Sequence, residues 1–345
     1  MVERARRQIG QTDIAKAVGV SVGTVSNTLN RPELVAEATR TKILQAMKRL
    51  DFVPNEAAAS LRRGTNRLFG LVVPDITNSF YAEIASGVAG AADALNYGVV
   101  LCNSGDDPAR ELVQLQMLTE LRVAGALVVP LTADPVRLTR IRDFGTHVVL
   151  IDRVADTHDG CSVAVDDVLG GDLAFRHLLA TRGQHLLLLN GQHSIPQCVD
   201  RRRGAIQALV RAGASADDLR EVVVGEMTRR AGHDAAVRLI AEHTRLGTSL
   251  PSGIFCTNDQ LAIGVIRALH EHGFNVPQTT AIVGYGDLVI ALDAPVPLTS
   301  VGQPNDAVGR SAVEALFAEV SDTAQAHVHA SRVLQPTLVV RESAP

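Results

Sequence analysis

TDIAKAVGVSVGTVSNTLN, residues 12–30, is the stretch of this sequence that decides the fold of its first part. It predicts two short helices separated at Gly19, because glycine supplies the backbone freedom that a tight turn between helices needs. Thr12 is expected to cap the first helix and Ser21 the second. The pattern is typical of a helix-turn-helix, which lays its second helix in the major groove of DNA. A plain helical hairpin within a three-helix domain is the alternative.

The two predicted helices have distinct inner and outer faces. Ile14, Ala15 and Val18 form one apolar stripe, and Val25 and Leu29, four residues apart, face back onto it. The residues left pointing outward on the second helix are Val22, Gly23, Ser26 and Asn27.

A third amphipathic helix is predicted over residues 38–50, with Ile43 and Met47 on its inner face. Phe52-Val-Pro-Asn55 and a short helix-prone segment, residues 56–64, follow it. This order of elements resembles the lactose-repressor (LacI/GalR) family of bacterial transcription regulators. The resemblance continues in family order through GLVVPDITNSFYAEI (70–84), LCNS (101–104), VLIDR (149–153), VAVDD (163–167), FCTND (255–259), IVGY (282–285) and LTSV (298–301).

Charge is distributed unevenly along the 345 residues. Residues 1–63 carry eleven Lys or Arg against six Asp or Glu, whereas the rest carries 22 against 31. A basic head on an acidic body suits a protein that contacts phosphates at one end only. Ordinary scatter of surface charge is the alternative.

No segment has the character of a membrane span or an export signal. The N-terminus, MVERARR, is polar, and no apolar run approaches the roughly 20 residues of a transmembrane helix. The cysteines lack a Cys-x-x-Cys pair, so we expect buried reduced thiols rather than disulfides or zinc ligands at Cys102, Cys161, Cys198 and Cys256. These features predict a cytoplasmic protein.

From about Arg67, short aliphatic runs alternate with amphipathic helical stretches, a pattern that predicts βα units on buried parallel sheets. The runs are 68–73, 99–101, 126–129, 148–151, 186–189, 221–224, 253–256 and 281–283. The resemblance implies how these units are arranged. An all-α helix-turn-helix head would precede an α/β bilobed core of the periplasmic-binding-protein kind, built on two doubly wound parallel sheets.

The resemblance also implies the domain organisation. It places a DNA-binding head at 1–55, a hinge helix or linker at 56–66, and an effector-binding and dimerisation core at 67–345. In that fold the chain crosses between the lobes three times, which we expect near 163–167, 293–299 and 323–332. The lobes would then comprise about 67–164 with 296–325, and about 165–295 with 326–345.

Signatures of enzymes are missing from the sequence. Gly284-Tyr-Gly286 lacks the third glycine of a dinucleotide loop, and no phosphate-binding loop with Gly-Lys-Ser/Thr occurs. Ser104 lacks the preceding glycine of a nucleophile elbow. Two His-x-His pairs, His270/His272 and His327/His329, could bind metal on a strand, but on helices they would point to different faces. We therefore expect no catalytic residue, no metal and no cofactor.

For the second helix, the resemblance assigns base contacts to Val22, Gly23 and Asn27. Asn can pair with adenine and Val can pack on a thymine methyl, whereas Gly reads nothing. Ser21, Thr24 and Ser26 would mainly hold phosphates or cap the helix. Asn27 stands where the family most often has Arg, so direct base reading is expected to be modest.

In the linker, the resemblance matches Leu61 to a leucine that wedges into the minor groove of bent DNA. Arg62 and Arg63 would then hold phosphates. A plain linker helix with Leu61 packed on the core is the alternative. An isolated helix of this length is marginal in water, so we expect it to order on DNA together with its twin from a second subunit.

The effector site implied by the resemblance lies between the lobes and includes Phe80, Tyr81, Asp152, Arg201 and Asn258. Carboxylate, amide and guanidinium groups can each engage hydroxyls in pairs, and an aromatic ring can stack on a sugar or purine face. Core packing of Phe80 and Tyr81, and an interlobe ion pair between Asp152 and Arg201, are the alternatives.

Two positions depart from the family pattern. Gly286 stands where the family usually has an Asp that binds ligand hydroxyls, with an acid one residue later at Asp287. Met227 replaces a common aromatic residue. A standard hexose is therefore in doubt as the effector. Another sugar, a phosphosugar or a nucleoside remains an alternative.

Together these features predict a homodimeric, effector-gated transcription regulator, most simply a repressor. It would bind double-stranded operator DNA at a near-palindromic site and a small metabolite between its lobes. A regulator with a non-sugar effector or with no effector is the alternative. A cytoplasmic sugar-binding protein would need no helix-turn-helix.

Overall fold

The computed structural model describes residues 9–52, 66–131, 134, 136, 139, 143, 146–154, 160–183, 185–322 and 326–345. They form two compact units, separated in the chain between Asn66 and Arg67. In the described residues, no helix is both long and apolar enough to cross a membrane.

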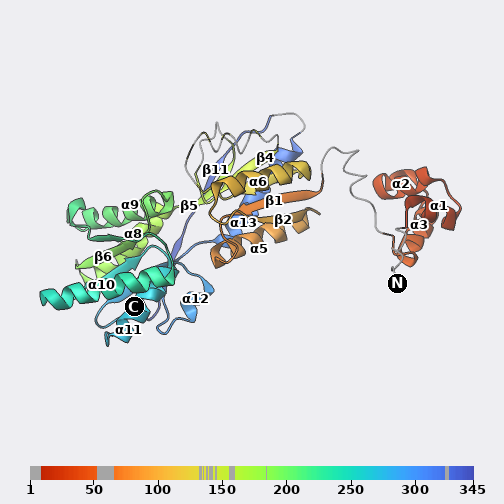
Figure 1. Cartoon of the computed structure of the whole chain (residues 1–345). Coiled ribbons are helices and arrows are strands. Elements are labelled where there is room, and N and C mark those ends of the chain that lie inside the picture. The colour runs from red at the N-terminus through yellow and green to blue at the C-terminus, as the bar shows by residue number, and fades with distance from the viewer. Residues whose placement is uncertain are drawn as a thin grey trace. The chain divides into compact units, whose positions relative to one another are not determined.

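The first unit, the head, contains α1 (Gln11–Val18), α2 (Val22–Asn30), the short 3-10 turn η1 (Pro32–Leu34) and α3 (Glu37–Arg49) (Figure 1). Its core consists of Ile14, Ala15, Val25, Ile43, Ala46 and Met47. The predicted inner faces of the helices are therefore confirmed, because these side chains come from the stripes that the sequence pattern indicated.

The turn between α1 and α2 forms as predicted at Gly19. Its φ of 75° is left-handed, and its N–H donates to the Ala15 carbonyl at 2.9 Å. Ser21 caps α2, accepting from the Thr24 N–H at 3.0 Å. The predicted cap at Thr12 is wrong, because α1 begins earlier. Gly10 is its N-cap residue, and its N–H donates to the Asp13 carboxylate at 2.9 Å.

Helix α3 ends with a left-handed residue that is not a glycine. Asp51 has a φ of 47°, and the following Phe52 N–H donates to the Met47 carbonyl at 3.0 Å. Asp tolerates this conformation better than most residues with a side chain. The helix end therefore keeps the geometry of a glycine cap at the position where the sequence departs from the family pattern.

The second unit begins with a six-stranded parallel sheet in the order β11-β5-β4-β3-β1-β2. Its strands are β1 (Leu68–Val73), β2 (Gly98–Asn103), β3 (Gly125–Val128), β4 (His147–Ile151), β5 (Ser162–Val165) and β11 (Ser331–Leu334). Helices α5 (Ser79–Ala94) and α13 (Asn305–Ser321) cover one face of this sheet, and α6 (Pro108–Glu120) covers the other (Figure 1).

The second sheet has the order β12-β10-β9-β8-β6-β7 and is parallel except for β12. Its strands are β6 (Leu186–Asn190), β7 (Glu221–Val223), β8 (Gly253–Cys256), β9 (Ala281–Gly286), β10 (Thr299–Gly302) and β12 (Thr337–Val339). Helices α8 (Asp167–Arg182) and α9 (Pro196–Arg211) pack on one face, and α10 (Arg229–Leu246) and α11 (Asp259–Glu271) on the other. The short elements η2 (Ala216–Asp218) and α12 (Val289–Leu292) lie in connections.

Two sheets with helices on both faces confirm the predicted bilobed α/β core, and all eight aliphatic runs contribute strands. The four cysteines are buried, and none is paired with another.

Two of the predicted lobe crossings lie elsewhere in the structure. The first crossing falls at β5–α8, within 163–167. The second follows β10, which pairs with β9, so residues 299–302 belong to the second lobe instead of the first. The third follows β11, which pairs with β5, so residues 331–334 belong to the first lobe instead of the second. Both strands are short and polar, so they lack the aliphatic run that marks a buried parallel strand.

Candidate functional site

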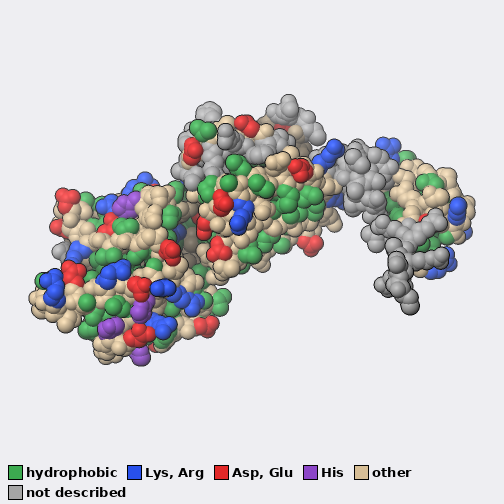
Figure 2. Space-filling model, viewed as in Figure 1, with side chains coloured by type: hydrophobic (Ala, Val, Ile, Leu, Met, Phe, Trp, Pro, Cys, Tyr) green, Lys and Arg blue, Asp and Glu red, His purple; other side chains and the backbone are tan. Residues whose placement is uncertain are grey.

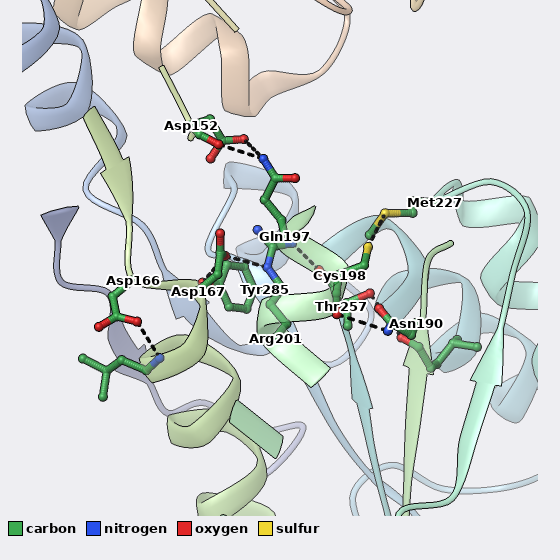
Figure 3. A network of polar contacts seen from close by, with 12 residues as sticks. Asp152, Asp166, Asp167, Asn190, Gln197, Cys198, Arg201, Met227, Thr257 and Tyr285 are labelled. Atoms are coloured by element: carbon green, nitrogen blue, oxygen red, sulfur yellow. Dashed lines mark hydrogen bonds and ion pairs between the residues drawn. The ribbon is translucent and has the colours of Figure 1, made fainter. Parts of the chain in front are cut away.

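A cavity of about 390 Å³ lies between the two lobes of the second unit. It is bordered by the segments that follow the carboxyl ends of β1, β4, β6, β8, β9 and β10, which is where open α/β sheets bind ligands. All five side chains that the sequence assigned to the effector site line it: Phe80, Tyr81, Asp152, Arg201 and Asn258. Figure 3 shows the polar network on its second-lobe side.

Arg201 is the anchor of this network. It extends from α9, and its side chain is 9% exposed. Its Nε donates to Asp167 Oδ1 at 2.8 Å and its Nη1 to the Thr257 carbonyl at 2.7 Å. The guanidinium carbon lies 3.7 Å from the centroid of the Tyr285 ring, and the Tyr285 hydroxyl donates to the same Asp167 oxygen at 2.7 Å.

This arrangement fixes the guanidinium and aims it at the cavity. Arg201 forms its buried ion pair with Asp167, which lies in the same lobe. The alternative of an ion pair between Arg201 and Asp152 across the lobes is therefore wrong. The side chain of Arg201 lines the cavity, where the guanidinium can meet a ligand oxygen. Asp167 and Tyr285, which hold Arg201, were not singled out from the sequence.

Asp152 follows β4 in the first lobe and has a left-handed φ of 60°. Burial, together with repulsion from Asp167, raises the pKa of its carboxyl to about 7, although Arg201 and the hydrogen bond from Gln197 oppose the shift. The raised pKa favours the protonated carboxyl at higher pH than for an ordinary Asp. The carboxyl can donate to, as well as accept from, a ligand hydroxyl.

Gln197 connects the two lobes across the cavity. From α9 in the second lobe, its Nε2 donates to the Asp152 carbonyl at 2.9 Å and to Asp152 Oδ2 at 2.8 Å (Figure 3). The sequence carried no signal for this residue, because its role depends on a partner 45 positions away in the chain. A ligand that binds Asp152 would compete with this bridge or reorganise it.

The aromatic and amide residues have mixed roles. Phe80 is 9% exposed and belongs to the core of the first lobe, while its ring meets Tyr81 edge-on at 5.0 Å. Asn258 caps α11 by accepting from the Leu261 N–H at 2.8 Å and donates to the Met227 carbonyl at 2.9 Å. Both residues therefore stabilise their lobes as well as lining the cavity.

Gly286, which stands where the family usually has Asp, lies where a side chain would be crowded. Its φ is 128°, and a Cβ there would lie 3.2 Å from Leu288 Cγ and 3.3 Å from Asp259 Oδ2. The next residue, Asp287, pairs with Arg341 at 2.6 Å and is not among the residues that line the cavity. Asp287 therefore does not replace the family's carboxylate in the described site.

Gln303 is a further cavity residue that sequence reasoning missed. It lies in the second crossing, just after β10, and its Oε1 is buried without a hydrogen-bond partner. A buried unpaired oxygen beside a polar cavity is suited to accept from a ligand hydroxyl. Asp75 and Arg229, which carry opposite charges, also line the cavity.

In the head, the predicted DNA-reading residues lie at the start of α2. Ser21, Val22 and Gly23 are exposed, with Val22 42% exposed, whereas Thr24, Ser26 and Asn27 are half-buried. The hydroxyls of Ser21 and Thr24 lie 2.9 Å apart. Figure 2 shows a few basic side chains near the margins of the visible face of the head. Leu61, Arg62 and Arg63 lie outside the described residues.

Comparisons with known protein families agree with this architecture. Residues 12–55 match the family described as bacterial regulatory proteins, lacI family, and residues 175–344 match the periplasmic binding protein-like domain.

Curated relatives match over nearly their full length. The chain is 30% identical over 343 residues to an HTH-type transcriptional repressor PurR of Photobacterium profundum, covering 96% of this chain and 97% of the relative. It is 32% identical over 327 residues to the ribose operon repressor of Escherichia coli K12, covering 94% and 93%.

Solved structures share the fold. The lac repressor dimer bound to operator and the anti-inducer ONPF superposes with a TM-score of 0.86 at 23% identity, covering 98% of this chain and 99% of that one. A complex of the transcriptional regulator CelR with cellobiose has a TM-score of 0.70 at 27% identity, covering 97% and 100%.

Proposed function

The chain belongs to the lacI family of bacterial regulatory proteins, and from this premise we propose that it is a transcriptional repressor gated by a small metabolite. The head binds operator DNA, and the metabolite binds in the cavity between the lobes. The observation that carries the gating is the pair of hydrogen bonds from Gln197 to Asp152, which joins the lobes inside that cavity.

A ligand at this place can bias the molecule because it contacts both lobes at once. Arg201 presents a fixed cation from the second lobe, and Asp152 presents a carboxyl from the first. A ligand that binds these groups in one arrangement of the lobes, and not in the other, shifts the equilibrium between them. Whether it releases DNA or promotes DNA binding is set by which arrangement it prefers.

The cavity fits a sugar or sugar derivative. Its volume of about 390 Å³ lies within the range for small-ligand sites, and its polar groups are those that engage hydroxyls in pairs. The ribose operon repressor among the relatives and the cellobiose complex among the solved structures support this class. A nucleoside, whose base would stack on the ring of Tyr81, is the second candidate.

On DNA, we propose a homodimer that places two heads on the half-sites of a near-palindrome. Val22 and Asn27 would contact base edges, with Ser21, Thr24 and Ser26 holding phosphates or the helix end. Leu61 would open a base step in the minor groove and Arg62 would bind phosphate. The fold of the lac repressor dimer on its operator supports this arrangement.

The proposal also covers the location of the protein and the absence of catalysis. It acts in the cytoplasm as a binding protein, carries out no catalysis and needs no cofactor for repression. The named roles of the relatives as repressors support this part.

The experiment tests the link between cavity and head. Genomic fragments are selected with the purified full chain, with and without fractions of a metabolite extract, and then sequenced. The selected site is used to compare the wild type with Arg201→Lys, which keeps the charge but loses the forked geometry. Arg203→Lys is the matched control, because Arg203 is exposed on the same helix and pairs with Asp200.

We expect one near-palindromic site whose occupancy a metabolite fraction changes at least fivefold. Arg201→Lys should abolish that change while leaving ligand-free binding intact, and Arg203→Lys should behave as the wild type. A site that no fraction affects would indicate a constitutive repressor. No enriched site at low salt would remove the DNA-binding role.

A further inference from the structure

A second cluster of reactive side chains lies in the first lobe. Cys161, Glu319, His327 and His329 each bring one donor atom to a common point, and these atoms all lie within 4.8 Å of one another. They come from the residue before β5, the last turns of α13 and the segment that leads into β11. The cluster is thus at the amino-terminal edge of the first sheet, whereas the cavity borders carboxyl ends.

Four distances between the donor atoms are close to those around a single tetrahedral ion. Cys161 Sγ lies 3.2 Å from His327 Nε2 and 3.7 Å from His329 Nδ1. Glu319 Oε1 lies 3.2 Å from His329 Nδ1 and 3.8 Å from His327 Nε2. Zinc bonded to sulfur, nitrogen and oxygen at its usual distances separates its ligands by about 3.4 to 3.6 Å.

The carboxylate of Glu319 is buried within the cluster. Glu319 is 5% exposed, and its Oε1 has ion-pair contacts to the two imidazoles. A buried carboxylate needs a nearby cation to offset the cost of leaving water, and a bound metal ion would supply one. The other oxygen, Oε2, faces His147 Nδ1 at 3.5 Å, which orients the carboxylate toward the cluster.

The sulfur of Cys161 is enclosed by the cluster. Cys161 is 2% exposed, and the Ala330 N–H donates to its sulfur at 3.5 Å. His329 remains 38% exposed and His327 21%, so an ion can reach the buried Cys161 and Glu319 past the two imidazoles. We expected His327 and His329 to point to different faces if they lay on a helix, and so not to share a metal ion. The pair instead lies in an extended segment, where both rings turn to the same point.

We propose that Cys161, Glu319, His327 and His329 bind one zinc ion per chain. The mixed sulfur, nitrogen and oxygen donor set is the set that Zn²⁺ prefers. The ion would hold the end of α13 and the segment before β11 against the start of β5. The bond from zinc to Cys161 forms as the S–H bond breaks, and the proton passes to the buffer.

The test uses the full chain after dialysis against a chelator. Zinc is titrated by calorimetry and bound metal is measured by elemental analysis. The variants are Cys161→Ser, Glu319→Gln and His329→Gln. The matched controls are Cys102→Ser, a buried thiol in the same lobe, and His233→Gln, which faces Glu271 at 2.9 Å in the second lobe.

We expect one zinc per chain in the wild type and in both controls. Each cluster variant should bind at least about a hundredfold more weakly, because losing a ligand costs more than losing an outer partner. His147→Gln, which removes only the partner of Glu319, should weaken binding roughly tenfold.

A second measurement does not depend on any variant folding. Cobalt added to the wild-type protein should give the intense visible bands of a tetrahedral ion and a thiolate-to-cobalt band in the near ultraviolet. Substoichiometric zinc binding, or cobalt spectra without the thiolate band, would overturn the proposal. The cluster would then be a set of histidines paired with Glu319 and no metal.

Discussion

At the scale of single residues, Arg201 combines buried stabilising contacts with a place in the lining of the cavity. Its guanidinium pairs with the buried Asp167 and stacks on Tyr285, and the residue lines the cavity. The position of Arg201 could be predicted from the sequence. Its partners could not, because Asp167 lies 34 positions away and Tyr285 lies on a strand beyond two further helices.

Removing this side chain should destabilise the core. Arg201→Ala leaves Asp167 buried without its cation, which we expect to lower the free energy of unfolding by about 3 to 5 kcal/mol. Denaturant unfolding of the full chain measures this loss, with the exposed Arg203→Ala as the control. A loss below about 1 kcal/mol would mean that Asp167 is neutral or hydrated in the folded protein.

Asp152 predicts a pH dependence with a definite sign. Burial and Asp167 raise its pKa from 3.8 to about 7, so the folded state holds a proton that the unfolded state releases between these values. The contribution of Asp152 to stability therefore falls as pH rises from about 4 to 7 and is constant above. The greatest slope is about 1.4 kcal/mol per pH unit.

Asp152→Asn should remove this dependence while keeping an acceptor for Gln197. The free energy of unfolding of the variant, minus that of the wild type, should increase with pH across this window. Denaturant unfolding at half-unit pH steps measures the difference. A constant difference would contradict the assignment, and the exposed Asp217→Asn should run parallel to the wild type.

At the scale of elements, the helix boundaries of the head differ in how well they could be predicted from the sequence. The Ser21 cap and the Gly19 turn follow from local chemistry, and both could be predicted from the sequence. The start of α1 could not, because Asp13 binds the Gly10 N–H and so begins the helix before Thr12. The polar strands β10 and β11 could not be predicted either. They pair with β9 and β5, and their own sequences carry no aliphatic run.

The cap of the DNA-reading helix should matter for operator binding. Ser21→Ala leaves the Thr24 N–H unpaired and should destabilise α2 by about 1 kcal/mol, equivalent to roughly fivefold in operator affinity. Ser21→Asn, which also caps, should restore most of the loss. Thr41→Ala, which removes a hydroxyl bonded within α3, is the control. Equal affinity of all variants would show that the cap has no part in binding.

At the scale of the whole molecule, the bilobed arrangement gives the cavity a lining from both lobes. The alternation of aliphatic runs predicted βα units on buried parallel sheets, and the resemblance implied their division between two lobes. The cavity needed tertiary structure, because Gln197 and Gln303 acquire their roles only when the lobes meet. The cluster of Cys161 with Glu319 and two histidines depends on the same long-range assembly.

The bridge between the lobes predicts a shift in their equilibrium. Gln197→Ala removes both hydrogen bonds to Asp152, each worth about 0.5 to 1.5 kcal/mol, and should favour separation of the lobes. Hydrogen–deuterium exchange should increase at residues 75–81 and 195–201. Gln207→Ala, exposed on the same helix, is the control. Unchanged exchange at both segments would show that the bridge does not hold the lobes.

The central claim is that the cavity between the lobes controls DNA binding by the head, and one titration tests it most directly. The selected operator is titrated with wild-type protein and with Gln197→Ala, each with and without the active metabolite fraction. The account predicts that the metabolite changes wild-type affinity at least fivefold and that Gln197→Ala reduces this change severalfold. An identical metabolite response in both proteins would contradict it.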